Sequence, residues 1–419
     1  MKKFGMGRDF YARHRLDLSP RDITFGVRSC CGSWRGERLE AEVLGLCSAE
    51  DEGLVCYSVR SGWDLWLRAR GLRVGDEVLV SAVTHPDMVR IIRGHGLRAV
   101  PVDIDPETLA PPPSALEAAL TPRTRVLLVA HLFGGCMDLG FVAGFAREHG
   151  LILVEDCAQA FRGPEWVGDS LADVSMYSFG ALKTSTALGG AILRVRDRGV
   201  LGKMRQAQAG YPVQCRGLYM KKLLLALGLV VLSRPRPYGL FVRSCAWLGA
   251  DLDALVNGAA RAFPSREPER AFFRRLKQRP CAPLLAVLSR RLRTFDPRRL
   301  AGRAAAGEWF TRKLRVVDAH PGWRSLRRTH WLFPVVVLDP AALIEDLRMR
   351  GLDASHTTSS IAVVETATED SPPARARLMM SGILFLPVYP GVPPHVLEAM
   401  ADLVNDRTAE MAVEDLALS

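Results

Sequence analysis

The sequence lacks the signatures of several common classes of metal-binding and nucleotide-binding proteins. Its nine cysteines form no CxxC pair and have no Cys/His spacing that suits zinc, and no GxGxxG motif follows an expected strand. We therefore expect no metal site, and a nicotinamide-dependent dehydrogenase is only a weak alternative. Because the number of cysteines is odd and the chain is long, a reducing compartment such as the cytosol is the natural setting.

No apolar run is long enough to cross a bilayer. The most apolar segment, residues 223–232, has about half of the roughly 20 residues that a transmembrane helix needs. Residues 1–11 lack the apolar core of a signal peptide, so we expect a cytoplasmic protein. We predict that residues 223–232 form a buried helix. Two alternatives stay open: a partner-binding helix, and a helix on a membrane surface with the basic flanks of segment 221–236 among the headgroups.

Acidic side chains are outnumbered by basic ones, 45 Asp and Glu against 56 Lys and Arg, which leaves a formal net charge of +11. This balance favours anionic partners such as phosphorylated metabolites or an acidic membrane. We expect no nucleic-acid binding, because aromatic residues do not alternate with the arginines. We interpret the arginine clusters as a solvated helical face, with a nucleotide diphosphate or lipid headgroups as alternative ligands. The clusters are Arg266, Arg270, Arg274, Arg275 and Arg290, Arg291, Arg293, Arg298, Arg299.

Short apolar runs alternate with helical stretches from residue 76 onward, which is typical of a mostly parallel sheet with helices on both faces. We expect strands at residues 77–82, 99–103, 125–130, 151–155, 174–178 and 191–195, and helices at 86–95, 114–119 and 141–150. A second unit has an expected strand at 331–338 and helices at 340–350 and 394–406. The expected domains are 1–209, an N-terminal segment with a large domain; 210–303, an Arg/Pro-rich helical elaboration; and 304–419, a small α/β domain.

One motif places polar groups directly after a buried strand, where ligands bind in parallel sheets. In VEDCAQA, residues 154–160, an apolar run ends at Asp156. A carboxylate at this place can pair with a protonated pyridine nitrogen and keep it charged. Gln159 can then reach the phenolic oxygen of the same ring. The alternative is that Asp156 only caps a following helix.

A second motif, YSFGALK at residues 177–183, precedes two glycines and the last strand of the series. Lys183 lies on a turn between two apolar strands, where desolvation favours the neutral amine that attacks an aldehyde. The hydroxyl of Ser178 can donate to a phosphate. The alternative for Lys183 is a solvated surface lysine.

Together the two motifs resemble those of the DegT/DnrJ/EryC1/StrS sugar aminotransferases, which carry E-D-x-A-Q-x and then S-F-x-x-x-K. The resemblance extends through GDEV at 75–78, VDID at 102–105 and HLFGG at 131–135, and ends loosely at LPVYPG, residues 386–391. It implies the fold type I architecture of aspartate aminotransferase: an α/β fold with a mostly parallel central sheet and a small C-terminal α/β domain. It also implies a homodimer.

The resemblance implies pyridoxal 5′-phosphate as the cofactor. Lys183 would hold it as a Schiff base, Asp156 would pair its ring nitrogen, Gln159 would contact its phenolic oxygen and Ser178 would bind its phosphate. No metal is implied.

Three segments depart from the family pattern. Ser58, Val59 and Arg60 replace the start of S-G-T-A; we expect a helix over 62–71 behind Ser61 and a phosphate near residues 58–60, with a solvated Arg60 as the alternative. His85 occupies the aromatic position that covers the cofactor ring, so we expect it to stack there, with a structural role as the alternative. Residues 210–212 are a poor counterpart of the family's G-Y-N-x-R segment.

We therefore predict a transaminase that moves an amino group from an amino acid, by resemblance glutamate, to a keto group on an anionic substrate. A nucleotide-linked keto sugar, or a related glycan or lipid precursor of the cell surface, is the expected acceptor. Lys183 would act as general base and acid. A pyridoxal phosphate enzyme of another reaction type and a catalytically silent or regulatory protein stay open.

Overall fold

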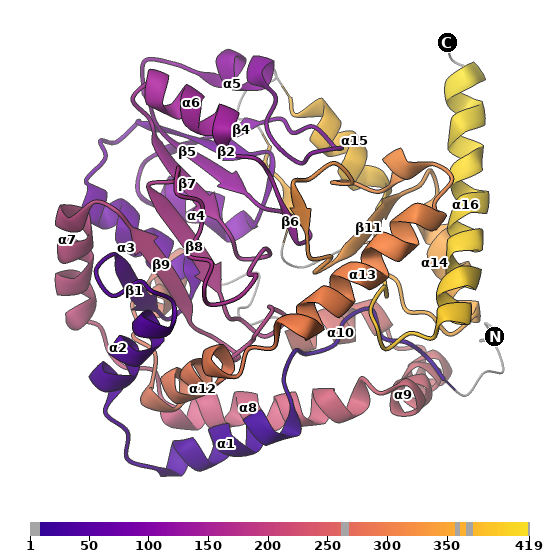
Figure 1. Ribbon diagram of the computed structural model, residues 1–419, viewed down its shortest axis with the longest axis horizontal. Coiled ribbons are helices and arrows are strands. Elements are labelled where there is room, and N and C mark those ends of the chain that lie inside the picture. Colours follow the sequence, from indigo (N-terminus) through magenta and orange to yellow (C-terminus); the bar gives the residue numbers. More distant parts are fainter. Residues whose placement is uncertain (1–8, 261–267, 357–360, 366–371, 418–419) are drawn as a thin grey trace.

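A seven-stranded sheet forms the centre of the molecule, which we describe from a computed structural model over residues 9–260, 268–356, 361–365 and 372–417 (Figure 1). The strand order is β1-β9-β8-β7-β5-β2-β4, and the strands from β8 to β4 are parallel. Strand β9 is antiparallel to both of its neighbours. The strands are β1 (Gly53–Cys56), β2 (Glu77–Ser81), β4 (Arg98–Val102), β5 (Thr124–Ala130), β7 (Ile152–Asp156), β8 (Val174–Ser178) and β9 (Ala191–Val195).

Helices cover both faces of this sheet, because successive side chains of each buried strand point to opposite sides. Val78 and Val80 of β2 pack with helices α3, α4 and α7, whereas Leu79 packs with α5 and α6 on the other face. These helices are α3 (Val59–Arg70), α4 (Pro86–Gly94), α5 (Pro113–Ala119), α6 (Gly140–Glu148) and α7 (Arg198–Ala209). The predicted α/β class is confirmed. Apart from α3, which starts three residues early, the strands and helices that were predicted here differ from the observed ones by at most two residues at an end, whereas β1 and α7 were not predicted.

A smaller unit packs beside the sheet around an antiparallel pair, β11 (Phe333–Val336) with β13 (Ile383–Leu386). Strand β11 is shorter than the strand predicted at 331–338. The last helix continues beyond residue 406, where the prediction ended it. Two separate short pairs join this unit to loops that follow the strands of the sheet: β10 (Arg327–Arg328) with β6 (Gly135–Cys136), and β12 (Ala362–Val363) with β3 (Val83–Thr84). Its helices are α13 (Pro297–Lys313), η1 (Val317–Ala319), α14 (Pro340–Met349), α15 (Ala374–Gly382) and α16 (Pro394–Ala417). We propose the three-part domain division, with α13 running across the expected boundary at residue 303.

The middle of the chain is helical and lies along the lower edge of the molecule together with α1, as Figure 1 shows. Helix α8 packs lengthwise against α1, and α12 packs against α1 and α2. The helices of the N-terminal segment and of the middle of the chain are α1 (Pro20–Cys31), α2 (Gly36–Leu46), α8 (Arg216–Leu232), α9 (Pro235–Leu248), α10 (Leu252–Ala260), α11 (Glu269–Leu276) and α12 (Ala282–Arg293). Helix α11 packs instead against α3 on the face of the sheet.

The prediction that residues 223–232 are buried is wrong for most of α8. Only Tyr219, Leu223 and Ala226 of this helix are buried, whereas Leu224 and Leu227 are 56% and 40% exposed. The helix is apolar on every side, but α1 and α12 cover only one of them, so the remaining leucines stay uncovered. Within the described ranges, no helix combines the length and the apolarity that crossing a membrane requires.

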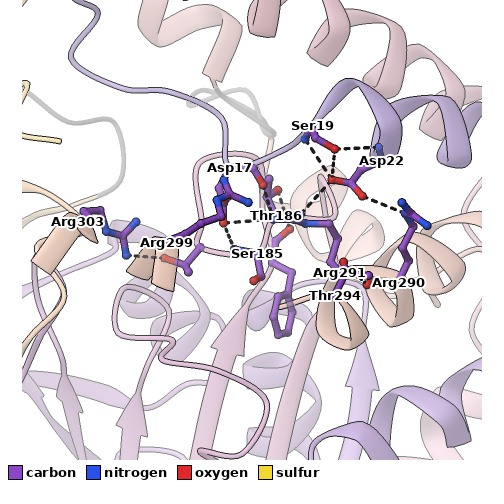
Figure 2. A network of polar contacts seen from close by, with 12 residues as sticks. Asp17, Ser19, Asp22, Ser185, Thr186, Arg290, Arg291, Thr294, Arg299 and Arg303 are labelled. Atoms are coloured by element: carbon purple, nitrogen blue, oxygen red, sulfur yellow. Dashed lines mark hydrogen bonds and ion pairs between the residues drawn. The ribbon is translucent and has the colours of Figure 1, made fainter. Parts of the chain in front are cut away.

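Arg291 is also buried, which corrects its assignment to a solvated helical face; Arg266, of the other cluster, lies outside the described residues. The guanidinium of Arg291 donates to the Asp22 carboxylate at 3.0 Å and to the Asp17 carbonyl at 2.7 Å (Figure 2). Asp17 in turn accepts from the backbone N–H of Ser185. This network fastens the N-terminal segment to α12 and to the turn that follows β8.

Replacing Arg291 by methionine should lower the free energy of unfolding by about 1.5 to 3 kcal/mol, because the buried Asp22 carboxylate then keeps only Arg290 as its cation and the Asp17 carbonyl loses a charged donor. The matched control is Arg293→Met, since Arg293 is exposed and pairs with Glu42 at the surface; its loss should cost less than about 1 kcal/mol. Urea unfolding followed by circular dichroism measures both. Equal effects of the two variants would contradict the structural role of Arg291.

Candidate active site at the carboxyl edge of the sheet

The two predicted motifs meet at one edge of the sheet. Asp156 is the last residue of β7, Ser178 is the last residue of the adjacent parallel strand β8, and Lys183 lies on the turn that follows. They line one cavity of about 560 Å³, a usual size for a small-molecule site. All expected cofactor contacts line it: Ser58, Val59, Arg60, His85, Asp156, Gln159, Ser178 and Lys183.

The carboxylate of Asp156 is buried at the base of the cavity. No helix follows it, so the helix-cap alternative is wrong; its Oδ1 instead accepts from the Ala158 N–H at 2.9 Å within a turn. Burial raises the pKa of Asp156 above its ordinary value, while the Ala158 N–H and the Lys183 ammonium oppose that rise. A carboxyl group in such surroundings gains from a cation placed beside it in the cavity.

The amine of Lys183 is enclosed rather than solvated, contrary to the surface-lysine alternative. Its Nζ lies 4.2 Å from the centre of the Trp331 ring. Burial lowers the pKa of Lys183 from 10.5 to about 8; the Asp156 carboxylate opposes this shift and Arg60 adds to it. About a tenth of the amine is therefore neutral at pH 7, the form that attacks a carbonyl carbon.

Helix α3 begins at the cavity, three residues earlier than predicted. Ser58 has an extended backbone and its Oγ accepts from the Ser61 N–H at 3.2 Å, so Ser58 is the cap and the helix starts at Val59. The first turn of a helix directs its backbone N–H groups outward and favours an anion there. The Arg60 guanidinium is not solvated, since it donates to Asp87 at 2.7 Å.

His85 and Gln159 have their orientation set by backbone N–H groups. The Nδ1 of His85 accepts from the Asp87 N–H at 3.1 Å and caps α4, which is the structural alternative for this residue. Burial, with Arg60 nearby, lowers the pKa of His85 to about 4, so its ring is neutral at physiological pH. The Oε1 of Gln159 accepts from the Phe133 N–H at 2.8 Å, which leaves its amide nitrogen as the donor.

Two residues of the site, His14 and Trp331, were not predicted. His14 comes from the N-terminal segment and Trp331 from the smaller unit, and their ring centres lie 5.8 Å apart beside Lys183. Burial, together with Arg13 and Lys183, lowers the pKa of His14 to about 4. Neither residue lies in a motif, so the sequence held no local signal for them.

A second cavity of about 600 Å³ shares His14, Lys183 and Trp331 with the first and has a strongly basic lining. Arg303 on α13 donates to the Thr329 carbonyl at 2.9 Å and to Thr184 Oγ1 at 3.1 Å. Burial lowers the pKa of Arg303 to about 10, against the opposing effect of Asp17. Further cationic side chains on this lining are Arg13, Arg15, Arg234, Arg291, Arg298 and Arg299.

Behind the sheet edge, His131, Glu155 and Cys157 form a buried cluster of residues that are able to bind metals. The Glu155 carboxylate already accepts from Ser175 at 2.5 Å and from the Asp169 N–H at 2.7 Å, and it pairs with His131 at 3.0 Å. Because these oxygens have protein donors, we interpret the cluster as structural.

Residues 35–212 match the model of the DegT/DnrJ/EryC1/StrS aminotransferase family. The matched part, somewhat under half of the chain, is therefore similar to the aminotransferases of that family. A curated relative, the UDP-N-acetyl-3-dehydro-alpha-D-glucosamine 3-aminotransferase of Acidithiobacillus ferrooxidans, is 35% identical over 175 residues, 41% of this chain and 47% of the relative. The pleiotropic regulatory protein of Geobacillus stearothermophilus is 32% identical over 173 residues, 40% of this chain and 46% of that protein. The aligned region thus spans about half the length of these relatives.

The solved structures show the fold over nearly the whole chain. The aminotransferase TlmJ from Streptoalloteichus hindustanus superposes with a TM-score of 0.68 at 20% sequence identity, covering 96% of this chain and 100% of that one. The predicted resemblance and fold are confirmed. The aminotransferases of this family use pyridoxal phosphate, and the donor set at this edge of the sheet fits that cofactor: a buried carboxylate for a ring nitrogen, a helix start for a phosphate and a desolvated amine for an aldehyde.

Covalent attachment of pyridoxal phosphate to the cofactor-free protein should speed up about tenfold per pH unit below pH 8 and level off above it, because the neutral Lys183 amine is the reactant. Borohydride reduction followed by peptide mass spectrometry measures the attachment. The exposed Lys203 supplies the control variant Lys203→Ala, which should keep the same profile. A midpoint near 10.5, or attachment at another lysine, would contradict the assignment.

Proposed function

We propose that the protein is a pyridoxal-phosphate-dependent aminotransferase. It would transfer an amino group from an amino acid, with glutamate as the first candidate, to a keto group of an anionic substrate. The observation that carries the proposal is that Lys183 and Asp156 line one cavity closely enough for each charge to shift the pKa of the other. The family match and the aminotransferase fold support it.

Each residue of the cavity has a task in this proposal. When bound, the cofactor supplies an aldehyde that condenses with amines and a ring that withdraws electrons from the neighbouring carbon. Asp156 would keep the ring nitrogen protonated, and Gln159 would donate its amide N–H to the phenolic oxygen. The start of α3, with Ser178 and Arg60, would hold the phosphate, and the neutral ring of His85 would cover one face of the cofactor.

Lys183 would also move the proton that transamination requires. An amine with a pKa of about 8 accepts a proton from the α-carbon of the donor and returns it at a neighbouring atom with little energetic cost near neutral pH. The overall exchange converts the amino acid into its 2-oxo acid and the ketone into a primary amine. It therefore needs no external oxidant or reductant.

The basic cavity beside Lys183 supports an anionic acceptor. Arg303 is held beside Lys183 by neutral oxygens, and Arg298 extends the positive lining toward solvent. Arg299 pairs with Asp17 in the same lining, so Arg303 is the main candidate for an anionic group. Guanidinium groups bind phosphate and carboxylate groups with paired hydrogen bonds. A nucleotide-linked keto sugar, or a related glycan or lipid precursor, fits this lining.

We further propose a cytoplasmic homodimer, by resemblance to the family, with peripheral membrane contact through segment 221–236. That segment combines exposed apolar side chains with basic flanks. Light scattering of the purified protein tests the dimer. Flotation with anionic vesicles tests the membrane contact, and protein that remains at the bottom of the gradient would remove it.

The alternative of a silent or regulatory protein is favoured by one observation, the match to a pleiotropic regulatory protein. The half-reaction with an amino acid separates the candidates without knowledge of the acceptor. Protein that forms no visible absorbance band with pyridoxal phosphate is not an enzyme of this kind. A band without release of 2-oxoglutarate or another 2-oxo acid indicates a different reaction type.

Glutamate should bleach the visible band of the cofactor-loaded protein and release one 2-oxoglutarate per site. Lys183→Ala should abolish the release, and Asp156→Ala should slow it by about 100- to 1,000-fold, because the charge that stabilises the electron-rich ring is lost. Stopped-flow absorbance with an enzymatic assay for 2-oxoglutarate measures both. Asp138→Asn, at an exposed position far from the cavity lining, is the control and should change the rate less than twofold.

A further inference from the structure

The cavity at Lys183 has an apolar wall that the proposed cofactor contacts do not use. It is formed by helices α8, α9 and α10, and its side chains are Leu225, Leu229, Leu232, Phe241, Leu255 and Val256. Pyridoxal phosphate and an amino acid are polar, so neither explains a wall of leucines. The wall therefore requires another ligand or another covering group.

Helix α8 has one apolar stripe in the core and a second stripe in this wall. Leu232, Phe241 and Val256 of the wall also pack against a small core cluster that includes Tyr238 and Val242, so the wall is only partly uncovered. Tyr219, Leu223 and Ala226 form one stripe of the helix, and this stripe is buried against α1 and α12. Leu225, Leu229 and Leu232 form a second stripe at helical spacing, and this one lines the cavity. A surface helix usually has one apolar stripe. The second stripe is what an apolar ligand in the cavity would need.

The wall also lies outside the part of the chain that matches the family. The match ends at residue 212, and α8 begins at Arg216. The shared region supplies the residues proposed to hold the cofactor, whereas the wall belongs to this chain's own helical segment. We therefore relate the wall to the acceptor, the reactant that differs most among enzymes sharing one cofactor site.

The charges around the wall indicate that the acceptor also carries an anionic group. Residues 216–250 contain Arg216, Lys221, Lys222, Arg234, Arg236 and Arg243 and no acidic residue. Lys222 itself lines the cavity, and the basic cavity joins this one at His14, Lys183 and Trp331. A second copy of the chain on this segment would bring like charges together under two-fold symmetry, whereas an anionic amphiphile brings the opposite charge.

We propose that the amino acceptor is an anionic amphiphile whose keto group lies at Lys183 and whose apolar segment lies on the wall formed by α8, α9 and α10. This inference rests on the proposed function and selects, among its acceptors, a lipid-type precursor over a nucleotide-linked sugar. The anionic group would face the arginines of the basic cavity.

Binding of 11-(dansylamino)undecanoate to the cofactor-loaded full chain tests the wall without any measurement of activity. We expect saturable fluorescence enhancement, with an affinity that rises by up to about fourfold for each methylene in a series of shorter and longer dansylated acids. Leu225→Glu should weaken binding at least tenfold. The matched control is Leu224→Glu at the neighbouring position. Leu225 and Leu224 are similarly exposed, at 52% and 56% respectively, but only Leu225 lines the cavity.

Equal weakening by the two variants would overturn the proposal, since the probe would then lie on the outer surface of α8. Absence of saturable binding would also overturn it. Displacement of the probe by uridine diphosphate but not by 2-dodecanone would assign the space to a nucleotide. The 2-oxoglutarate half-reaction is independent of these results, so failure of the wall and failure of the proposed function are distinguishable.

Discussion

The active-site arrangement depends on two parallel strands, β7 and β8, that end side by side at one edge of a buried sheet. Parallel pairing brings Asp156 and the turn with Lys183 to the same side, although they are distant in sequence. Both groups are then desolvated together, which raises the pKa of the carboxyl group and lowers that of the amine. The attraction between the two groups opposes both pKa shifts, and a polar aromatic ligand with a cationic nitrogen at one end and an aldehyde at the other fits between them.

The smaller unit and the N-terminal segment complete this site through a buried ion pair next to it, since Arg13 and Tyr238 line the same cavity as Lys183. Arg13 donates to both oxygens of Asp353, at 2.7 and 2.8 Å, and Tyr238 on α9 donates to the same carboxylate at 2.6 Å. A buried pair of this geometry fixes position more than it adds stability. It holds His14, the next residue, against Trp331 and therefore beside Lys183.

Helix α8 contributes both to the cavity at Lys183 and to the apolar surface of the molecule. One of its apolar stripes packs on the core, a second faces the cavity and further leucines are exposed at the surface. Because the same helix forms part of the site and of the apolar surface, an acceptor that enters from a membrane or a micelle would reach Lys183 by a short path along it. Arg298 and Arg303 of α13 line the other cavity, where an anionic group would be neutralised.

The sequence by itself determined the parallel strands of the central sheet and the residues at their ends, because burial on both faces makes each parallel strand a short apolar run that ends at its functional residue. It did not reveal β1 or β13, which pair in antiparallel fashion. The start of α3 was decided only by the tertiary structure. Serine is a good cap at both position 58 and position 61, and in the folded chain Ser58 is the cap. The tertiary structure also decided that Arg291 is buried, that α8 is covered on one side only, and that His14 and Trp331 reach Lys183. These features depend on which distant surfaces meet, and no local periodicity or motif encodes that.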